Sequence, residues 1–195
     1  MASEPFSILV AKFEVKATDK VFFNKVYIAL HDYFYMEEYA KERDAGFPEL
    51  LIWETRTHHE GKEIWVWWRP EKGITGNSFV KRTFIVDMHG VGLKEVELIK
   101  QNFKFKAVAG KVEFLIKARL EIDVGHRFRS NPLLSPIFNW FWQRIYKKNI
   151  DQHKLEMLKD AYKLQEFIKR QMELNTFVTP IQPFAPALGF PETNF

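Results

Sequence analysis

Residues 111–123 read KVEFLIKARLEID, and this stretch decides the fold. Apolar side chains occupy every second position, and most positions between them are charged. A period of two places the apolar set on one face of a strand, so that the other face meets water. The stretch therefore predicts a long, half-buried antiparallel strand. Its apolar face consists of Val112, Phe114, Ile116, Ala118, Leu120 and Ile122.

Other segments also alternate. Residues 6–17 predict a strand whose phase slips at Ala11–Lys12, as a β-bulge would cause. Residues 50–57 and 62–69 flank a short connector ending in Gly61, which predicts a hairpin. After a loop over residues 69–77, glycine and polar residues predict turns at 89–92, 101–102 and 109–110. These turns separate expected strands at 79–88, 93–100 and 103–108.

Three segments have helical spacing. Thr18–Asp19 offers an N-cap for a helix that fades around Glu42. Ser135–Pro136 opens a helix that runs toward Asn149. Residues 151–174 carry one apolar stripe on an otherwise mostly polar helix.

The composition is that of a folded chain. Its 195 residues include 29 Lys+Arg and 25 Asp+Glu, a net charge of +4, and 46 % are hydrophobic. These fractions exclude a disordered chain and predict one domain over residues 1–174 with an appendage at 175–195. The absence of cysteine excludes disulfides, thiolate metal sites and iron–sulfur clusters. With no membrane-length apolar run and no evident signal peptide, we expect a soluble, cytoplasmic protein.

The order of elements, a strand, a helix, a run of antiparallel strands and a long C-terminal helix, resembles the helix-grip fold. This is the fold of the START-like superfamily, which includes polyketide cyclases and lipid-transfer domains. The resemblance covers residues 6–174 and is one of element order. It implies an α+β fold in which a curved antiparallel sheet wraps the C-terminal helix, with an apolar cavity between them. It implies no catalytic residue, because the superfamily shares no catalytic signature.

Residues 64–68, IWVWW, place apolar side chains on both faces of one strand. Such a strand is buried on both sides, or one of its faces meets a ligand or a partner. In a cavity between the sheet and the last helix, we expect the ligand-binding residues to be Trp53, Trp65, Trp67, Phe114, Ile116, Ala161, Leu164 and Ile168.

Residues 125–148 mix basic and aromatic side chains and contain no acidic residue. The aromatic residues could pack this segment on the sheet while the cations face water. Alternatively, the segment could contact a protein partner or an anionic membrane surface. Contact with a membrane surface would place the protein at the periphery of a membrane. Nucleic acid receives little support from a net charge of +4. The candidate contact residues here are Trp140, Trp142, Arg144, Lys147 and Lys148.

The appendage at residues 175–195 contains four prolines and is rich in phenylalanine. Proline excludes a central strand or a helix, and the apolar residues favour an extended strap in a groove. Its expected anchors are Phe184 and Phe190. The groove could belong to the same chain, to a twin subunit in a homodimer, or to another protein.

Three functions follow from these observations. The leading one is non-catalytic binding of an apolar or amphipathic, lipid-like small molecule. The second is an interaction protein that docks a protein partner or an anionic membrane. The third is a cyclase- or hydrolase-like enzyme that uses one of four strand carboxylates: Glu54, Asp87, Glu113 or Glu121.

No cofactor, catalytic residue or metal ligand is assigned from the sequence. His58, His59 and Glu60 are adjacent, but neighbouring side chains point in different directions. A metal would need a further ligand such as His89 or His126, and exposed polar residues of a hairpin are the better interpretation.

Overall fold

The computed structural model describes residues 6–18, 20–43, 46–57, 61–74, 76–100, 103–125, 128 and 130–172. The strap predicted at residues 175–195, with Phe184 and Phe190, lies outside the described residues, as do His58, His59 and His126.

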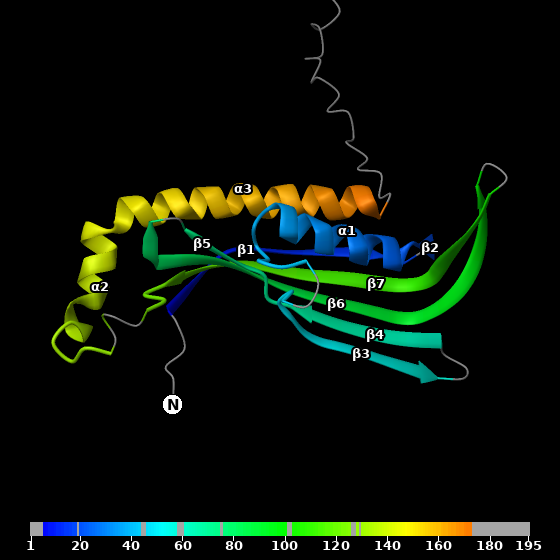
Figure 1. Ribbon diagram of the computed structural model, residues 1–195, viewed down its shortest axis with the longest axis horizontal. Coiled ribbons are helices and arrows are strands. Elements are labelled where there is room, and N and C mark those ends of the chain that lie inside the picture. The colour runs from blue at the N-terminus through cyan, green and yellow to red at the C-terminus, as the bar shows by residue number, and fades with distance from the viewer. Residues whose placement is uncertain are drawn as a thin grey trace, which may run out of the picture.

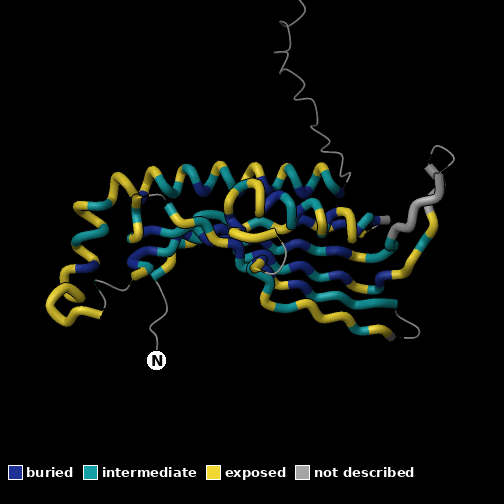
Figure 2. Tube along the Cα trace, viewed as in Figure 1, coloured by how far each residue is buried: buried dark blue, intermediate teal, exposed yellow. Residues whose placement is uncertain are grey.

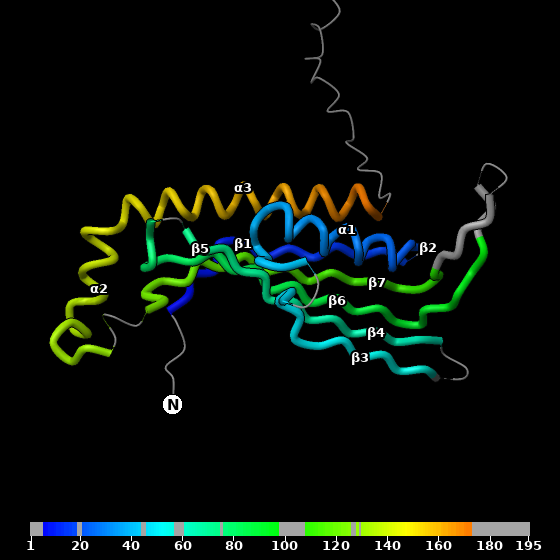
Figure 3. Tube along the Cα trace, viewed as in Figure 1, coloured from blue at the N-terminus to red at the C-terminus, as the bar shows by residue number. Residues whose placement is uncertain are grey.

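The protein is an α+β structure built on one open antiparallel sheet (Figure 1). The main strand order is β1-β7-β6-β4-β3, while β2 pairs with β7 and β5 with β6. The first strand in the chain thus lies beside the last one (Figure 3). The strands are β1 (Phe6–Ala17), β2 (Lys20–Val21), β3 (Glu49–Thr57), β4 (Gly61–Trp68), β5 (Glu71–Ile74), β6 (Asn77–Lys100) and β7 (Phe103–Ile122).

Two long helices, α1 (Phe23–Met36) and α3 (Lys147–Gln171), pack on the same face of the sheet, which we call the inner face. Between β7 and α3 the chain forms three short helical elements at one end of the long axis of the molecule (Figure 1). These are η1 (Ser135–Ile137), α2 (Phe138–Trp140) and η2 (Phe141–Ile145). The helix expected from residue 135 is therefore short and irregular, and it ends before α3 begins.

The strand that decides the fold is confirmed. All six apolar residues of its alternating set, from Val112 to Ile122, are 0 % exposed. β7 pairs with β1 on one side and with β6 on the other. The register of the β1–β7 pairing shifts between Leu9 and Ala11, next to the expected bulge.

The predicted turns at residues 89–92 and 109–110 are wrong. β6 and β7 continue through Gly90, Gly92 and Gly110 and bend together there (Figure 1). Their pairing shifts by one residue between Val91 and Lys94, which is a β-bulge. A Cβ atom on Gly110 would lie 2.9 Å from Leu93 Cδ2 and 3.0 Å from two backbone oxygens. Glycine at this position therefore permits a tight bend within a strand rather than a turn between strands.

The predicted bounds of the first helix are also wrong. Lys20 and Val21 pair with β7, so α1 begins only at Phe23 and has no side-chain cap. The helix ends at Met36, and Glu38 adopts a left-handed conformation with φ of 62°. This break turns the chain so that Tyr39 and Ala40 become buried. The expected loop after β4 contains the short strand β5.

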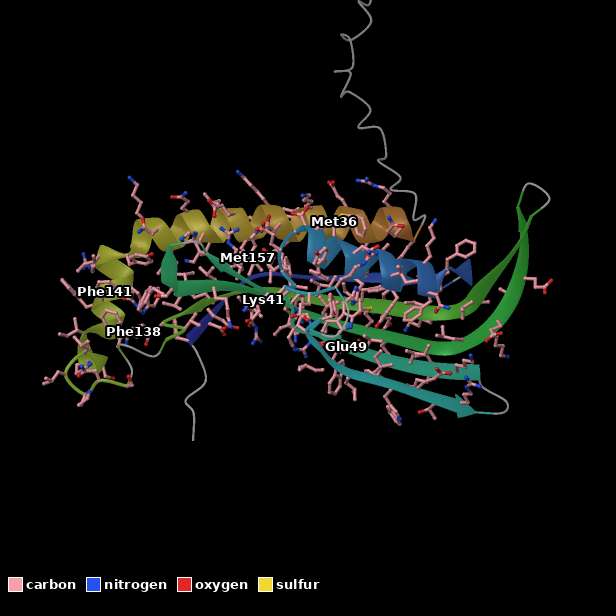
Figure 4. The ribbon with its side chains drawn as sticks, viewed as in Figure 1. Met36, Lys41, Glu49, Phe138, Phe141 and Met157 are labelled. Atoms are coloured by element: carbon pink, nitrogen blue, oxygen red, sulfur yellow. The ribbon has the colours of Figure 1, made fainter. Side chains whose placement is uncertain are left out.

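The core fills the space between the inner face, α1 and α3, seen as dark blue segments in Figure 2. Met157, Ala161, Leu164 and Ile168 form the buried stripe of α3, each at most 1 % exposed (Met157 is labelled in Figure 4). They pack with Phe114 and Ile116 in one cluster. A curved antiparallel sheet with a long C-terminal helix on one face is compatible with the helix-grip fold. Among the described residues, no helix combines the length and apolarity that a membrane crossing requires.

Candidate functional site

The first turns of α1 and the bent half of the sheet enclose a groove of about 790 Å³, which we call the α1 groove. The helix starts here because β2 fastens the preceding residues to β7. β4, β6 and β7 supply the opposite wall, where the bulge bends the sheet. The lining residues are Phe22, Phe23, Asn24, Lys25, Ile28, Ala29, Asp32, Glu54, Lys62, Ile64, Leu93, Glu95, Val108 and Gln171.

The sheet side of the groove is apolar at its base. Ile64, Leu93 and Val108 come from three neighbouring strands. Leu93 is 2 % exposed and joins the main core, against which Ile64 and Val108 also pack. On the helix side, Ile28 is 58 % exposed. An exposed isoleucine above an apolar base gives a bound molecule apolar contacts on both sides.

Charged residues line the sheet side above this base. Lys62 Nζ lies 3.0 Å from Glu95 Oε1 and 3.7 Å from Glu54 Oε1. A hydrogen bond from Arg56, with the charges of Arg56 and Lys62, holds the pKa of Glu54 below its usual range. Glu54 is therefore ionised at neutral pH. On the helix side, Asp32 forms an ion pair of 2.7 Å with Arg43.

The four strand carboxylates proposed as catalytic candidates are all paired with cations. Asp87 lies 2.8 Å from Arg69, and Glu121 lies 3.3 Å from Lys81. Lys111 donates a hydrogen bond to Glu113 and, with Lys16, lowers its pKa as Arg56 does for Glu54. A general acid working near neutral pH needs a raised pKa, and Glu54 and Glu113 shift in the opposite direction.

The described residues contain no group of three or more potential His, Asp or Glu ligands for a metal ion. His89 is the one member of the histidine set named from the sequence that the structure describes. Its Nε2 atom lies 2.8 Å from Glu63 Oε1, and its ring stacks on Trp65 at 3.6 Å. This pair lies on the outer face of β4, away from the α1 groove.

None of the eight residues expected to bind the ligand lines the α1 groove. Five of them, Phe114, Ile116, Ala161, Leu164 and Ile168, are at most 1 % exposed and fill the core. The other three, Trp53, Trp65 and Trp67, share the outer face of β3 and β4. Trp53 is 55 % exposed and Trp67 39 %. The inner face of β4 carries Ile64, Val66 and Trp68 instead.

The groove was not predicted from the sequence, because several of its sheet residues lie beyond the bend of β6 and β7 at the glycines. Leu93 and Glu95 come after Gly92, and Val108 precedes Gly110, in segments predicted to be separate short strands. The useful signal was the register of the two strands, which no local pattern reveals.

The expected contact residues of the basic aromatic segment separate into two groups. Trp140 is 57 % exposed, and Arg144, Lys147 and Lys148 are exposed as well. Trp142 instead packs on Phe6, with ring centroids 5.3 Å apart.

A scan against models of known protein families finds no match to this chain, and no curated protein matches it.

Proposed function

We propose that the protein binds an amphipathic small molecule in the α1 groove, without catalysing a reaction. The observation that carries this proposal is an apolar base of Ile64, Leu93 and Val108 beneath a charged edge at Lys62 and Glu95. A volume of about 790 Å³ is within the range of small-molecule sites, which is roughly 300–1,000 Å³.

The α1 groove does not lie between the sheet and the C-terminal helix, where the ligand cavity was expected from the sequence. That space holds core side chains such as Leu164 and Ile168. α3 contributes only Gln171, near its end, to the α1 groove. The proposal therefore assigns the gripping role to α1 and the bent sheet.

The mixed lining favours a ligand with an apolar body and an uncharged, hydrogen-bonding head. The groove residues include the cations Lys25 and Lys62 and the anions Asp32, Glu54 and Glu95. With both signs close together, a strongly charged head would meet repulsion as well as attraction. A hydroxyl or amide head could use Asn24 or Gln171 while the body covers the apolar base.

The proposal includes distant membership of the START-like superfamily, whose members hold apolar ligands under a helix. The curved sheet and its one-sided helices support this relationship. Binding is favoured over catalysis because the described carboxylates at this groove are ion-paired.

The first test is direct. Freshly purified protein measured by native mass spectrometry should carry additional mass, or should bind the uncharged dye Nile red at one molecule per chain. Ala29→Trp places an indole in the groove from α1 and should weaken dye binding by at least about tenfold. Unfolding curves should remain close to those of the wild type, because Ala29 is not part of the buried core.

The matched control is Leu155→Trp on α3, at a side chain that is 61 % exposed and outside the groove. It adds the same indole and should leave dye binding unchanged. Stoichiometric binding that survives Ala29→Trp would place the site elsewhere. A folded wild-type protein that neither retains a molecule nor binds the dye would contradict the proposed function.

A further inference from the structure

Residues 133–148 present exposed apolar residues followed by exposed cations at one end of the molecule. The apolar side chains are large: Leu133 is 81 % exposed, Ile145 59 %, Trp140 57 % and Ile137 46 %. Leu134 adds a further 37 %. The cations are Arg144, just before Ile145, and Lys147 and Lys148 after it. We call these eight residues the apolar–basic surface.

The exposed side chains are not needed to hold the segment in place, because its other side is anchored. Phe138 is 6 % exposed and packs edge-on against Phe6 at 5.8 Å. Phe141 stacks on Phe128 at 4.7 Å and lies near Tyr146 (Phe138 and Phe141 are labelled in Figure 4). Aromatic packing thus fixes the segment to the sheet, and the opposite side remains available for another contact.

The exposed residues follow one another along the chain through several elements. The apolar ones lie mainly in the turn before η1, at the end of η1 and at the end of α2: Leu133, Leu134, Ile137 and Trp140. The cations follow in η2 and in the first turn of α3. The short helical elements lie across the end of the molecule, crosswise to α3 (Figure 1).

The charge of the surface selects its partner. Residues 124–150 contain no Asp or Glu, and the first carboxylate after them, Asp151, pairs with Lys154 at 3.3 Å. A surface with exposed Leu, Ile and Trp beside a cluster of three exposed cations matches the interface of an anionic bilayer. There, apolar side chains enter the acyl boundary, Trp settles at headgroup depth, and Arg or Lys meets anionic headgroups.

From this geometry we infer that the apolar–basic surface docks the protein, end-on, to an anionic membrane. The inference is independent of ligand binding, since the α1 groove lies toward the opposite end of the long axis (Figure 1). A protein partner would need acidic residues to pair with the same cations. The five exposed apolar residues of the apolar–basic surface favour the bilayer, because its acyl boundary can accept all of them.

The experiment is co-sedimentation of the full chain with vesicles of phosphatidylcholine alone or with 30 mol % phosphatidylserine added. Binding should require phosphatidylserine and should weaken as salt rises, because exposed charges are screened. The triple variant Arg144→Gln, Lys147→Gln, Lys148→Gln should lower affinity about 100-fold, roughly fivefold for each charge removed.

A control variant removes the same number of charges elsewhere. Lys41→Gln, Lys94→Gln, Lys159→Gln changes three exposed lysines outside the surface and should alter affinity by less than about twofold. Equal losses in the two triple variants would mean that net charge alone attracts the protein, and would overturn the assigned surface.

Depth is tested with lipids brominated on the acyl chain, which quench nearby tryptophan. Quenching should be large in the wild type and should mostly disappear in Trp140→Phe. A wild-type protein that ignores anionic vesicles at low salt would overturn the inference. Binding of an acidic protein through these cations without vesicle binding would also overturn it, and would assign the surface to a protein partner.

Discussion

The hydroxyl of Tyr39 donates a hydrogen bond of 2.6 Å to the carboxylate of Asp160, 121 positions later in the chain. Tyr39 lies just after α1 and is 2 % exposed, whereas Asp160 lies on α3. Arg82 of β6 approaches the same region and contacts both Glu156 and Asp160. This single bond therefore joins the end of one helix to the middle of the other, above the sheet.

We expect Tyr39→Phe to lower the free energy of unfolding by about 1.5–3 kcal/mol, because the lost bond has a charged acceptor. Urea unfolding followed by circular dichroism measures the loss. Tyr162→Phe, at a residue on α3 that is 59 % exposed, is the control and should change stability by less than about 0.5 kcal/mol. Equal effects of the two changes would show that the Tyr39 bond contributes no stability.

The raised pKa of Tyr27 predicts that the protein loses stability at alkaline pH. Burial, together with the nearby charge of Glu49, raises the pKa of Tyr27 from 10.0 to about 12. Since the folded state holds this proton more tightly than the unfolded state, its contribution is complete below pH 10 and declines between pH 10 and about 12. Unfolding midpoints at pH 9 and pH 11 should therefore differ more for the wild type than for Tyr27→Phe.

Tyr33 and Tyr39 also have raised pKa values, so both proteins should lose some stability. Only the difference between them reports on Tyr27. Tyr35→Phe, at a side chain that is 45 % exposed, should retain the wild-type pH dependence. If Tyr27→Phe also retains it, Tyr27 is not the group that titrates.

The bend in β6 and β7 should depend on Gly110. Gly110→Ala brings a methyl group within 2.9 Å of Leu93 and 3.0 Å of backbone oxygens, and backbone cannot give way cheaply. We expect a loss of about 1–3 kcal/mol, as for other overpacked sites. Gly73→Ala is the matched control, because a Cβ there meets nothing within 4 Å. Urea unfolding that is equally affected by both changes would contradict the steric explanation.

Adjacent tryptophans on β4 should respond differently to truncation. Trp68 is 0 % exposed and packs edge-on against Tyr27 and Phe47. Trp68→Ala should cost about 3–5 kcal/mol through lost burial and the cavity left behind. Trp67→Ala, on the outer face, should lower the free energy of unfolding by only about 1 kcal/mol. The reverse order in unfolding experiments would mean that the outer face is the better packed one.

The strands were predictable from the sequence wherever burial alternates along one strand. The set from Val112 to Ile122 shows this clearly, because one face meets the core and the other face carries charges. The positions of Gly92 and Gly110 within strands were not predictable, because glycine occurs equally in a turn and in a bulge. What distinguishes the two is the partner strand, and pairing between distant residues leaves no local pattern.

The candidate site was less predictable for a related reason. Alternation over residues 64–68 shows that β4 has two apolar faces, but not which of them the helices cover. The helices select the face of Trp68, so Trp65 and Trp67 fall outside. The exposed cations Arg144, Lys147 and Lys148 were easier to place, because residues 124–150 contain no acidic residue that could pair with a cation within the segment.

The bulge in β6 also fixes how many residues the chain has at that point. Before it, the even-numbered Val86 and Met88 face the core, whereas after it the odd-numbered Leu93 and Glu95 face inward. Deleting Gly92 would restore a regular ladder, because Leu93 would then lie opposite Gly110 and Lys94 would keep its pairing with Ala109. With Gly90 facing inward, plain alternation would still place Leu93 and Glu95 inward. A single-codon deletion of Gly92 would thus remove the bulge while keeping the same residues in the wall of the site.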